Sequence, residues 1–120
     1  MFTSNLPQCI TPLLKCDGWS VTTVEGVGTV DNLDQVQSQL ISKNGTQCGF
    51  CTPGFVISMH SLRMDNQSPS AEQIEQILDG NLCRCTGYRP IFDAFRSFAS
   101  ERGSVDIEDL IKRGTKNCPK

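Results

Sequence analysis

QCGFCTPGFV, at positions 47–56, places two cysteines directly before the start of a predicted helix. Cys48 and Cys51 have the spacing CxxC, and Thr52 followed by Pro53 is typical of a helix N-cap with a proline in the first turn. A CxxC pair occurs in zinc sites, in redox dithiols and in metal clusters. This stretch alone leaves all three open.

A second pair, Cys83 and Cys85, follows after residues 52–82, which have room for two helices and their connection. If those helices pack as an antiparallel hairpin, the chain returns and the two cysteine pairs meet. The apolar positions of both helices need no cofactor to explain them, since they form a core in most proteins. The sequence therefore predicts four thiolates at one site, in loops of a helical domain.

Three kinds of site remain open from the spacing. Zinc accepts four thiolates, but its usual pattern is a CxxC pair in each of two knuckles, and Cys83-Arg-Cys85 is tighter. A [2Fe-2S] cluster has two irons with two thiolates each, so unequal spacings are natural, and glycines at 49, 54 and 87 would let backbone amides approach the sulfurs. A thioredoxin-like redox CxxC and simple buried thiols are the remaining possibilities, and a redox CxxC leaves the second pair unexplained.

Apolar spacing predicts an all-α fold with four helices. The first follows Gly28, with Asp31 or Asn32 as its cap, and stops at 44–45. The second begins at the CxxC and runs to Asp65, with Thr52 as its N-cap.

Two further helices follow in the sequence. Ser70 and Gln73 have the spacing of a capping box and Gly80 ends that helix. Pro90 opens the fourth, which is the most amphipathic. Before all of these, residues 19–24 predict one short strand.

Composition excludes several classes of function. Eleven basic and thirteen acidic residues give a net charge of −2 without a basic stripe, so nucleic acid is not an expected partner. No apolar run approaches the roughly 20 residues that cross a bilayer, and the expected compartment is the cytoplasm. Seven cysteines cannot all pair in disulfides, and clustered cysteines in a reducing compartment more often hold metal.

The segments GTQCGFCTPGFV at 45–56, GNLCRCTGYRPI at 80–91 and VTTVEGVG at 21–28 closely resemble the iron–sulfur part of the xanthine dehydrogenase and aldehyde oxidase family of molybdenum hydroxylases. The resemblance covers about residues 9–100. In that family a ferredoxin-like [2Fe-2S] domain precedes a four-helix [2Fe-2S] domain, and flavin and molybdenum domains follow. The expected division is therefore a ferredoxin-like remnant at 1–30, the helical domain at 31–100 and a linker or tail at 101–120.

The resemblance implies a role for each cysteine of the two pairs. Cys48, Cys51, Cys83 and Cys85 would ligate the cluster nearer the molybdenum cofactor, and Gln47 would lie against the pterin of that cofactor.

Three other cysteines and one histidine stand apart. By the same resemblance, Cys9 matches a ligand of the first cluster, but without that cluster's other ligands it is expected to be an orphan. Cys16 and Cys118 have no assigned role, and His60 is expected to be an ordinary helix residue.

The function implied is a one-electron relay from the molybdenum cofactor towards a second cluster and FAD. The partners implied are the molybdenum-cofactor, FAD and ferredoxin-like domains or subunits, in enzymes that are homodimers. The sequence contains no nucleophile and base pair and no phosphate loop, so the chain by itself is expected to be catalytically inactive. The alternative is a structural zinc-binding or interaction module derived from such a domain.

Overall fold

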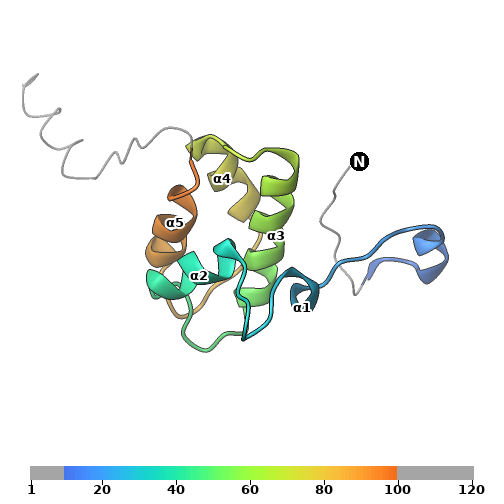
Figure 1. The fold of residues 1–120 in the computed structure, drawn as a ribbon, viewed down its shortest axis with the longest axis horizontal. Coiled ribbons are helices and arrows are strands. Elements are labelled where there is room, and N and C mark those ends of the chain that lie inside the picture. The colour runs from blue at the N-terminus through green and yellow to red at the C-terminus, as the bar shows by residue number, and fades with distance from the viewer. Residues whose placement is uncertain (1–9, 100–120) are drawn as a thin grey trace, which may run out of the picture.

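The computed structural model describes residues 10–99, and every regular element within them is helical (Figure 1). In chain order these are the 3-10 helix η2 Leu13–Cys16 and the α-helices α1 Val24–Val27, α2 Gln35–Ser42, α3 Thr52–Asp65, α4 Ala71–Leu78 and α5 Arg89–Arg96. The predicted all-α fold is confirmed. The four expected helices correspond to α2, α3, α4 and α5, and α1 is a short addition to them.

Helix α3 is the central element of the bundle. It packs against α1, α2 and α4, while α5 packs against α2 and α4. The chain turns after α3 and returns as α4, so the segment before α3 and the segment after α4 lie at the same end of the bundle (Figure 1). These are the two segments that carry the cysteine pairs.

The core is formed by apolar side chains from α2, α3, α4 and α5. Phe55 and Phe95 are the largest side chains that are fully buried. Each buried large apolar side chain stabilises the fold by roughly 1.5–3 kcal/mol relative to an exposed one. The other core residues are Val36, Leu40, Val56, Met59, Ile74, Leu78, Cys83, Ile91 and Ala94. One of the four candidate ligands thus belongs to the core.

Two arginines join the helices at the surface. Arg63 of α3 donates a hydrogen bond to Gln35 of α2 at 2.9 Å, and its guanidinium lies 4.5 Å from the ring centroid of Phe98. Arg96 of α5 forms an ion pair with Glu75 of α4 at 2.6 Å. Such pairs add little stability in water, but these two link helices that also share the core.

Helix α2 begins later than the sequence predicted. Its N-cap is Asp34, whose side chain forms a capping box with that of Gln37, so the prediction of Asp31 or Asn32 as the cap is wrong. The backbone of Asn32 instead exchanges hydrogen bonds with that of Thr29, at 3.1 and 3.2 Å. Asn32 is therefore part of a turn that precedes the helix. The reciprocal capping box at Asp34 is stronger than a single cap, so the helix begins there.

The starts of the other helices follow the sequence more closely. The Ser70 and Gln73 capping box of α4 is confirmed, with Ser70 Oγ accepting from the Gln73 N–H at 3.2 Å. Pro90 lies in the first turn of α5 as predicted. Helix α3 differs by one residue, because Cys51 is its N-cap and Thr52 is already helical.

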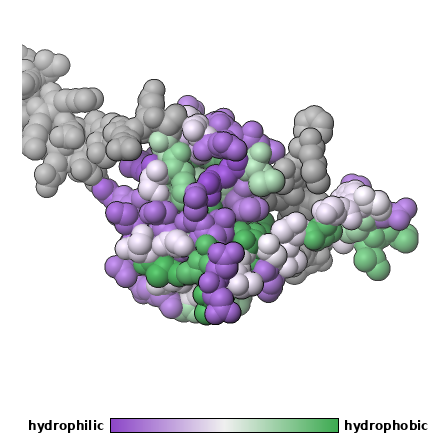
Figure 2. Space-filling view, viewed as in Figure 1, coloured by the Kyte–Doolittle hydropathy of each residue, from purple (hydrophilic) through white to green (hydrophobic). Residues whose placement is uncertain are grey.

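The N-terminal part contains no strand within the described residues, so the prediction of a strand at 19–24 is wrong. No neighbouring strand is available there to complete a ladder, and Val24 instead begins α1. The side chains of Val24 and Val27 pack against the core. Residues before α1 extend away from the bundle (Figure 1), and Figure 2 shows apolar surface on this extension. Leu13 and Leu14 are exposed there.

Several sequence predictions fall outside the described residues. The predicted tail at 101–120, with Cys118, and the orphan Cys9 belong to this group. None of the described helices is both long and apolar enough to cross a bilayer. The division at 1–30, 31–100 and 101–120 stays a prediction.

Candidate metal centre

The first cysteine loop, residues 47–51, leads directly into α3. Gly49 adopts a φ of +82°, which L side chains rarely adopt, and so turns the chain between the two cysteines. The turn brings the N–H of Phe50 to the Cys48 sulfur, and this hydrogen bond lowers the pKa of Cys48. Cys51 is half-buried at the start of α3, and burial raises its pKa to about 11.

The second cysteine loop, residues 81–88, lies between α4 and α5. Gly87 and Tyr88 both have positive φ, at 66° and 68°. A tyrosine in this region is strained, and two contacts hold it there. The Cys83 N–H donates to Tyr88 Oη at 3.0 Å, and the Tyr88 ring meets Phe55 edge-on at 6.4 Å between centroids. The loop is therefore closed over the core.

Cys83 has the most structured environment of the four cysteines. Its Sγ lies 3.0 Å from Thr86 Oγ1 and accepts a hydrogen bond from the Thr86 N–H at 3.5 Å. The hydroxyl is the main reason that the pKa of Cys83 falls to about 7. Cys83 itself is buried, with 9% of its surface exposed. Thr86 thus favours the thiolate form, which is the form that binds metal.

The fold brings the four predicted ligands together in two pairs. Cys48 and Cys85 hydrogen-bond each other through their sulfurs, and this contact raises the pKa of Cys85. Cys51 and Cys83 form the second such pair. All four are free thiols. Cys48 and Cys85 are exposed and form the outer pair, whereas Cys51 and Cys83 are more enclosed and form the inner pair.

The second cysteine loop is anchored to α3 by Asn81. Its Nδ2 donates to Ser58 Oγ at 3.1 Å. A Cβ on Gly54 would lie 2.8 Å from Asn81 Oδ1, so the glycine makes space for this side chain. The sequence suggested a different use for Gly54, the approach of an amide to sulfur. On α3 it makes room for the contact between the second cysteine loop and this helix, and its suggested use at a sulfur stays a prediction.

The donor set fits a two-iron cluster better than a single ion. A zinc ion needs four thiolates around one point. Two irons need two thiolates each, which is how the outer and inner pairs are arranged. Backbone N–H groups at Phe50 and Thr86 already point to sulfurs, as an anionic cluster requires.

The remaining residues singled out from the sequence lie around this centre or away from it. Gln47 is exposed and directly precedes Cys48. Arg89 forms an ion pair with Asp93 at 3.2 Å, and Arg84 is exposed.

Two residues without a predicted role lie elsewhere. His60 is half-buried on α3 and lines a polar pocket with Asp34 and Arg63. Cys16 lies in η2, and its Sγ contacts the Pro12 carbonyl at 3.8 Å.

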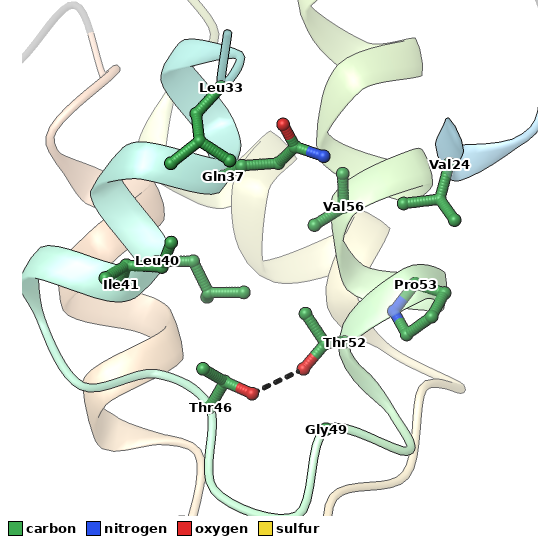
Figure 3. A pocket seen from close by; sticks show the side chains of 10 residues that line it. All are labelled: Val24, Leu33, Gln37, Leu40, Ile41, Thr46, Gly49, Thr52, Pro53 and Val56. Atoms are coloured by element: carbon green, nitrogen blue, oxygen red, sulfur yellow. Dashed lines mark hydrogen bonds between the residues drawn. The ribbon is translucent and has the colours of Figure 1, made fainter. Parts of the chain in front are cut away.

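An apolar pocket of about 330 Å³ lies behind the first cysteine loop, between α1, α2 and α3 (Figure 3). Leu40 and Val56 point into it from α2 and α3. At its lower edge Thr46 and Thr52 join through their hydroxyls at 2.7 Å. Among the residues that line this pocket there is no cysteine. This pocket lies behind the loop and is separate from the thiols.

Three residues of the second cysteine loop were not singled out from the sequence. Thr86 and Tyr88 hydrogen-bond Cys83, and Asn81 hydrogen-bonds Ser58 of α3. Apolar periodicity has no information on such contacts. The one signal was a hydroxyl residue three positions after a candidate ligand.

Comparison with known proteins gives this geometry a context. A family described as a [2Fe-2S] binding domain matches residues 23–96. Xanthine dehydrogenase 1 of Arabidopsis thaliana is 57% identical over an alignment of 116 residues that covers 92% of this chain and 8% of that protein. Aldehyde oxidase 2 of Rattus norvegicus is 47% identical over 111 residues, again 92% of this chain and 8% of the relative.

A solved structure extends the likeness to the fold. Aldehyde oxidoreductase from Desulfovibrio gigas superimposes with a TM-score of 0.68 and 42% identity, over 72% of this chain and 10% of that one. The chain thus spans less than a tenth of the length of the curated relatives described above.

Proposed function

We propose, because this chain belongs to the [2Fe-2S] binding domain family, that Cys48, Cys51, Cys83 and Cys85 hold one [2Fe-2S] cluster. The observation that carries this proposal is the arrangement of the four thiols in two pairs. When bound, the cluster supplies a centre that accepts and gives up one electron at a time. The function is therefore electron transfer.

The chain's own residues bind the group and balance its charge. The inner pair is enclosed by the bundle, where Cys83 packs with the core, so water is largely kept from it. N–H groups of Phe50 and Thr86 hydrogen-bond the sulfurs and offset their negative charge. The outer pair reaches the surface at the end of the bundle. Electrons would enter or leave at this exposed edge.

The partners follow from the size of the relatives. Because it matches less than a tenth of each relative, we expect this chain to work together with the other domains or subunits of a larger oxidoreductase. The complete enzyme would pass electrons from a molybdenum cofactor, with Gln47 against its pterin, through this cluster to a ferredoxin-like cluster and FAD. We place such an enzyme in the cytoplasm as a homodimer. The chain by itself would carry electrons without catalysing hydroxylation.

The alternative is a zinc-binding or interaction module. Four thiols are also a zinc donor set, which is the reason to test it. The pairwise arrangement favours the cluster, because a zinc ion would have to draw the outer and inner pairs to a single point.

Anaerobic reconstitution of the 120-residue chain with iron and sulfide tests the proposal. The expected product has two irons and two sulfides per chain, visible charge-transfer absorption and an electron paramagnetic resonance signal after reduction with dithionite. A parallel sample receives zinc. Stoichiometric zinc binding, together with no visible absorption after iron and sulfide, would favour the alternative.

A further inference from the structure

We propose that the hydroxyl of Thr86 donates a hydrogen bond to the Cys83 sulfur and thereby raises the reduction potential of the bound cluster. This inference rests on the proposed function, since it concerns one ligand of the proposed cluster. It adds a residue that controls how readily the centre accepts its electron.

The direction of the hydrogen bond follows from the chemistry of the ligand. Thr86 Oγ1 lies 3.0 Å from Cys83 Sγ, and in the metal-free chain either atom can be the donor. A cysteine that ligates iron is a thiolate and has no proton to give. The hydroxyl is then the only donor of this pair, and its proton must point at sulfur.

The loop also fixes the hydroxyl from its other side. The N–H of Tyr88 donates to Thr86 Oγ1 at 3.2 Å, which occupies an acceptor position and leaves the hydroxyl proton for the sulfur. The Cys83 N–H returns a hydrogen bond to Tyr88 Oη at 3.0 Å, so the contacts close a ring. Because threonine is β-branched, its χ1 is restricted as well. The donor is positioned before any metal binds.

This hydrogen bond is stronger to the reduced centre than to the oxidised one. Reduction adds one electron, so negative charge on the thiolate sulfurs increases and each donor gains interaction energy. No bond forms or breaks, and the proton stays on the Thr86 oxygen. Cys83 is buried, so water competes less there than at the exposed Cys48 and Cys85. The effect is therefore concentrated on the inner pair.

Thr86→Val tests the inference in the reconstituted chain, because it removes the hydroxyl and keeps the branched shape. We expect the reduction potential, measured by titration with dithionite and followed by paramagnetic resonance, to fall. The expected change is about tenfold in the ratio of reduced to oxidised cluster, or about 59 mV for one electron. Thr86→Ser keeps a hydroxyl and should restore most of the potential.

Thr46→Val is the matched control. It is the same substitution next to the other cysteine loop, where the hydroxyl bonds Thr52 and not a sulfur. The reduction potential of the cluster in this variant should equal that in the unmodified chain. An equal fall in the Thr46 and Thr86 variants, or a loaded Thr86→Val chain with an unchanged potential, would overturn the inference.

Failure of the inference and failure of the proposed function give different results. If the unmodified chain takes up no cluster, both fail; if it takes one up and Thr86→Val has an unchanged potential, only the inference fails. Should the valine variant not load, Thr86→Ala replaces it in the same comparison. Should neither load, the unmodified chain decides: its iron–thiolate stretching bands must shift when water is exchanged for deuterium oxide, and bands that do not shift overturn the inference.

Discussion

The two cysteine loops supply the same number of thiols but are built in different ways. In the first loop a single glycine and the start of α3 determine where Cys48 and Cys51 lie. In the second loop side-chain hydrogen bonds from Thr86 and Tyr88 determine the position of Cys83. One loop is thus shaped by backbone conformation and the other by a polar network. The comparison teaches that equivalent ligands can depend on unequal numbers of supporting residues.

The largest effect should come from the replacement of Cys83, the buried thiol of the inner pair. Cys83→Ser removes a thiolate from the inner pair, and we expect the chain to retain no stable cluster, as measured by iron content and visible absorption after reconstitution. Cys16→Ser is the control, because that thiol lies in η2, where its sulfur contacts the Pro12 carbonyl. A Cys16 variant with the same loss would contradict the assignment.

Loss of the tyrosine hydroxyl should affect the second loop next most strongly. Tyr88→Phe leaves the N–H of Cys83 without its acceptor, and an unsatisfied buried group costs about 1–3 kcal/mol. Urea unfolding of the metal-free chain measures this free energy. An unchanged free energy of unfolding would mean that the ring packing against Phe55, which the variant keeps, holds the loop by itself.

Glycine substitutions test the backbone part of each loop. Gly49→Ala and Gly87→Ala both place a side chain on a residue with positive φ, and neither new Cβ would meet another atom within 4 Å. Each should therefore lower the free energy of unfolding by roughly 1–2 kcal/mol through backbone strain alone. The same urea titration applies. If only Gly49→Ala is costly, the polar network of the second loop compensates for the strain.

The smallest effect should follow from the loss of the threonine hydrogen bond that flanks the first loop. Thr46→Val removes the contact to the Thr52 hydroxyl, which is worth about 0.5–1.5 kcal/mol. Thermal unfolding of the metal-free chain is sensitive enough to detect it. A loss larger than that of Tyr88→Phe would reverse the comparison, since the first loop would then depend more on its side chains than the second.

The sequence predicted the helices well where the signal is local. Ser70 and Gln73 form their capping box because both partners lie within one turn, and Pro90 lies in a first turn for the same reason. The cap of α2 was misplaced because a turn at Thr29 and Asn32 competes with it. Residues 19–24 have the composition of a strand, but a strand needs a partner that the described chain does not provide.

Only part of the candidate site could be predicted from the sequence. The spacing of the cysteines predicted that two pairs would meet, and their sulfurs do hydrogen-bond across the loops. Which cysteines pair, and which pair is enclosed, depends on how the two loops pack on the core, to which Cys83 belongs, and could not be predicted from spacing. Thr86 contacts Cys83 within the loop, three positions along the chain, which is the one signal that the sequence offered. Tyr88 also contacts Phe55 of α3, and no periodicity or motif rule indicates that tertiary contact.

Because the outer pair is exposed, its thiols can be oxidised before a metal binds. Cys48 and Cys85 are exposed neighbours, and such thiols are readily oxidised to a disulfide or to sulfenic acid. Either product blocks the ligands. The exposure that lets iron and sulfide reach these two thiols also admits oxidants, so the order of their arrival decides whether the chain can take up a cluster or is damaged first.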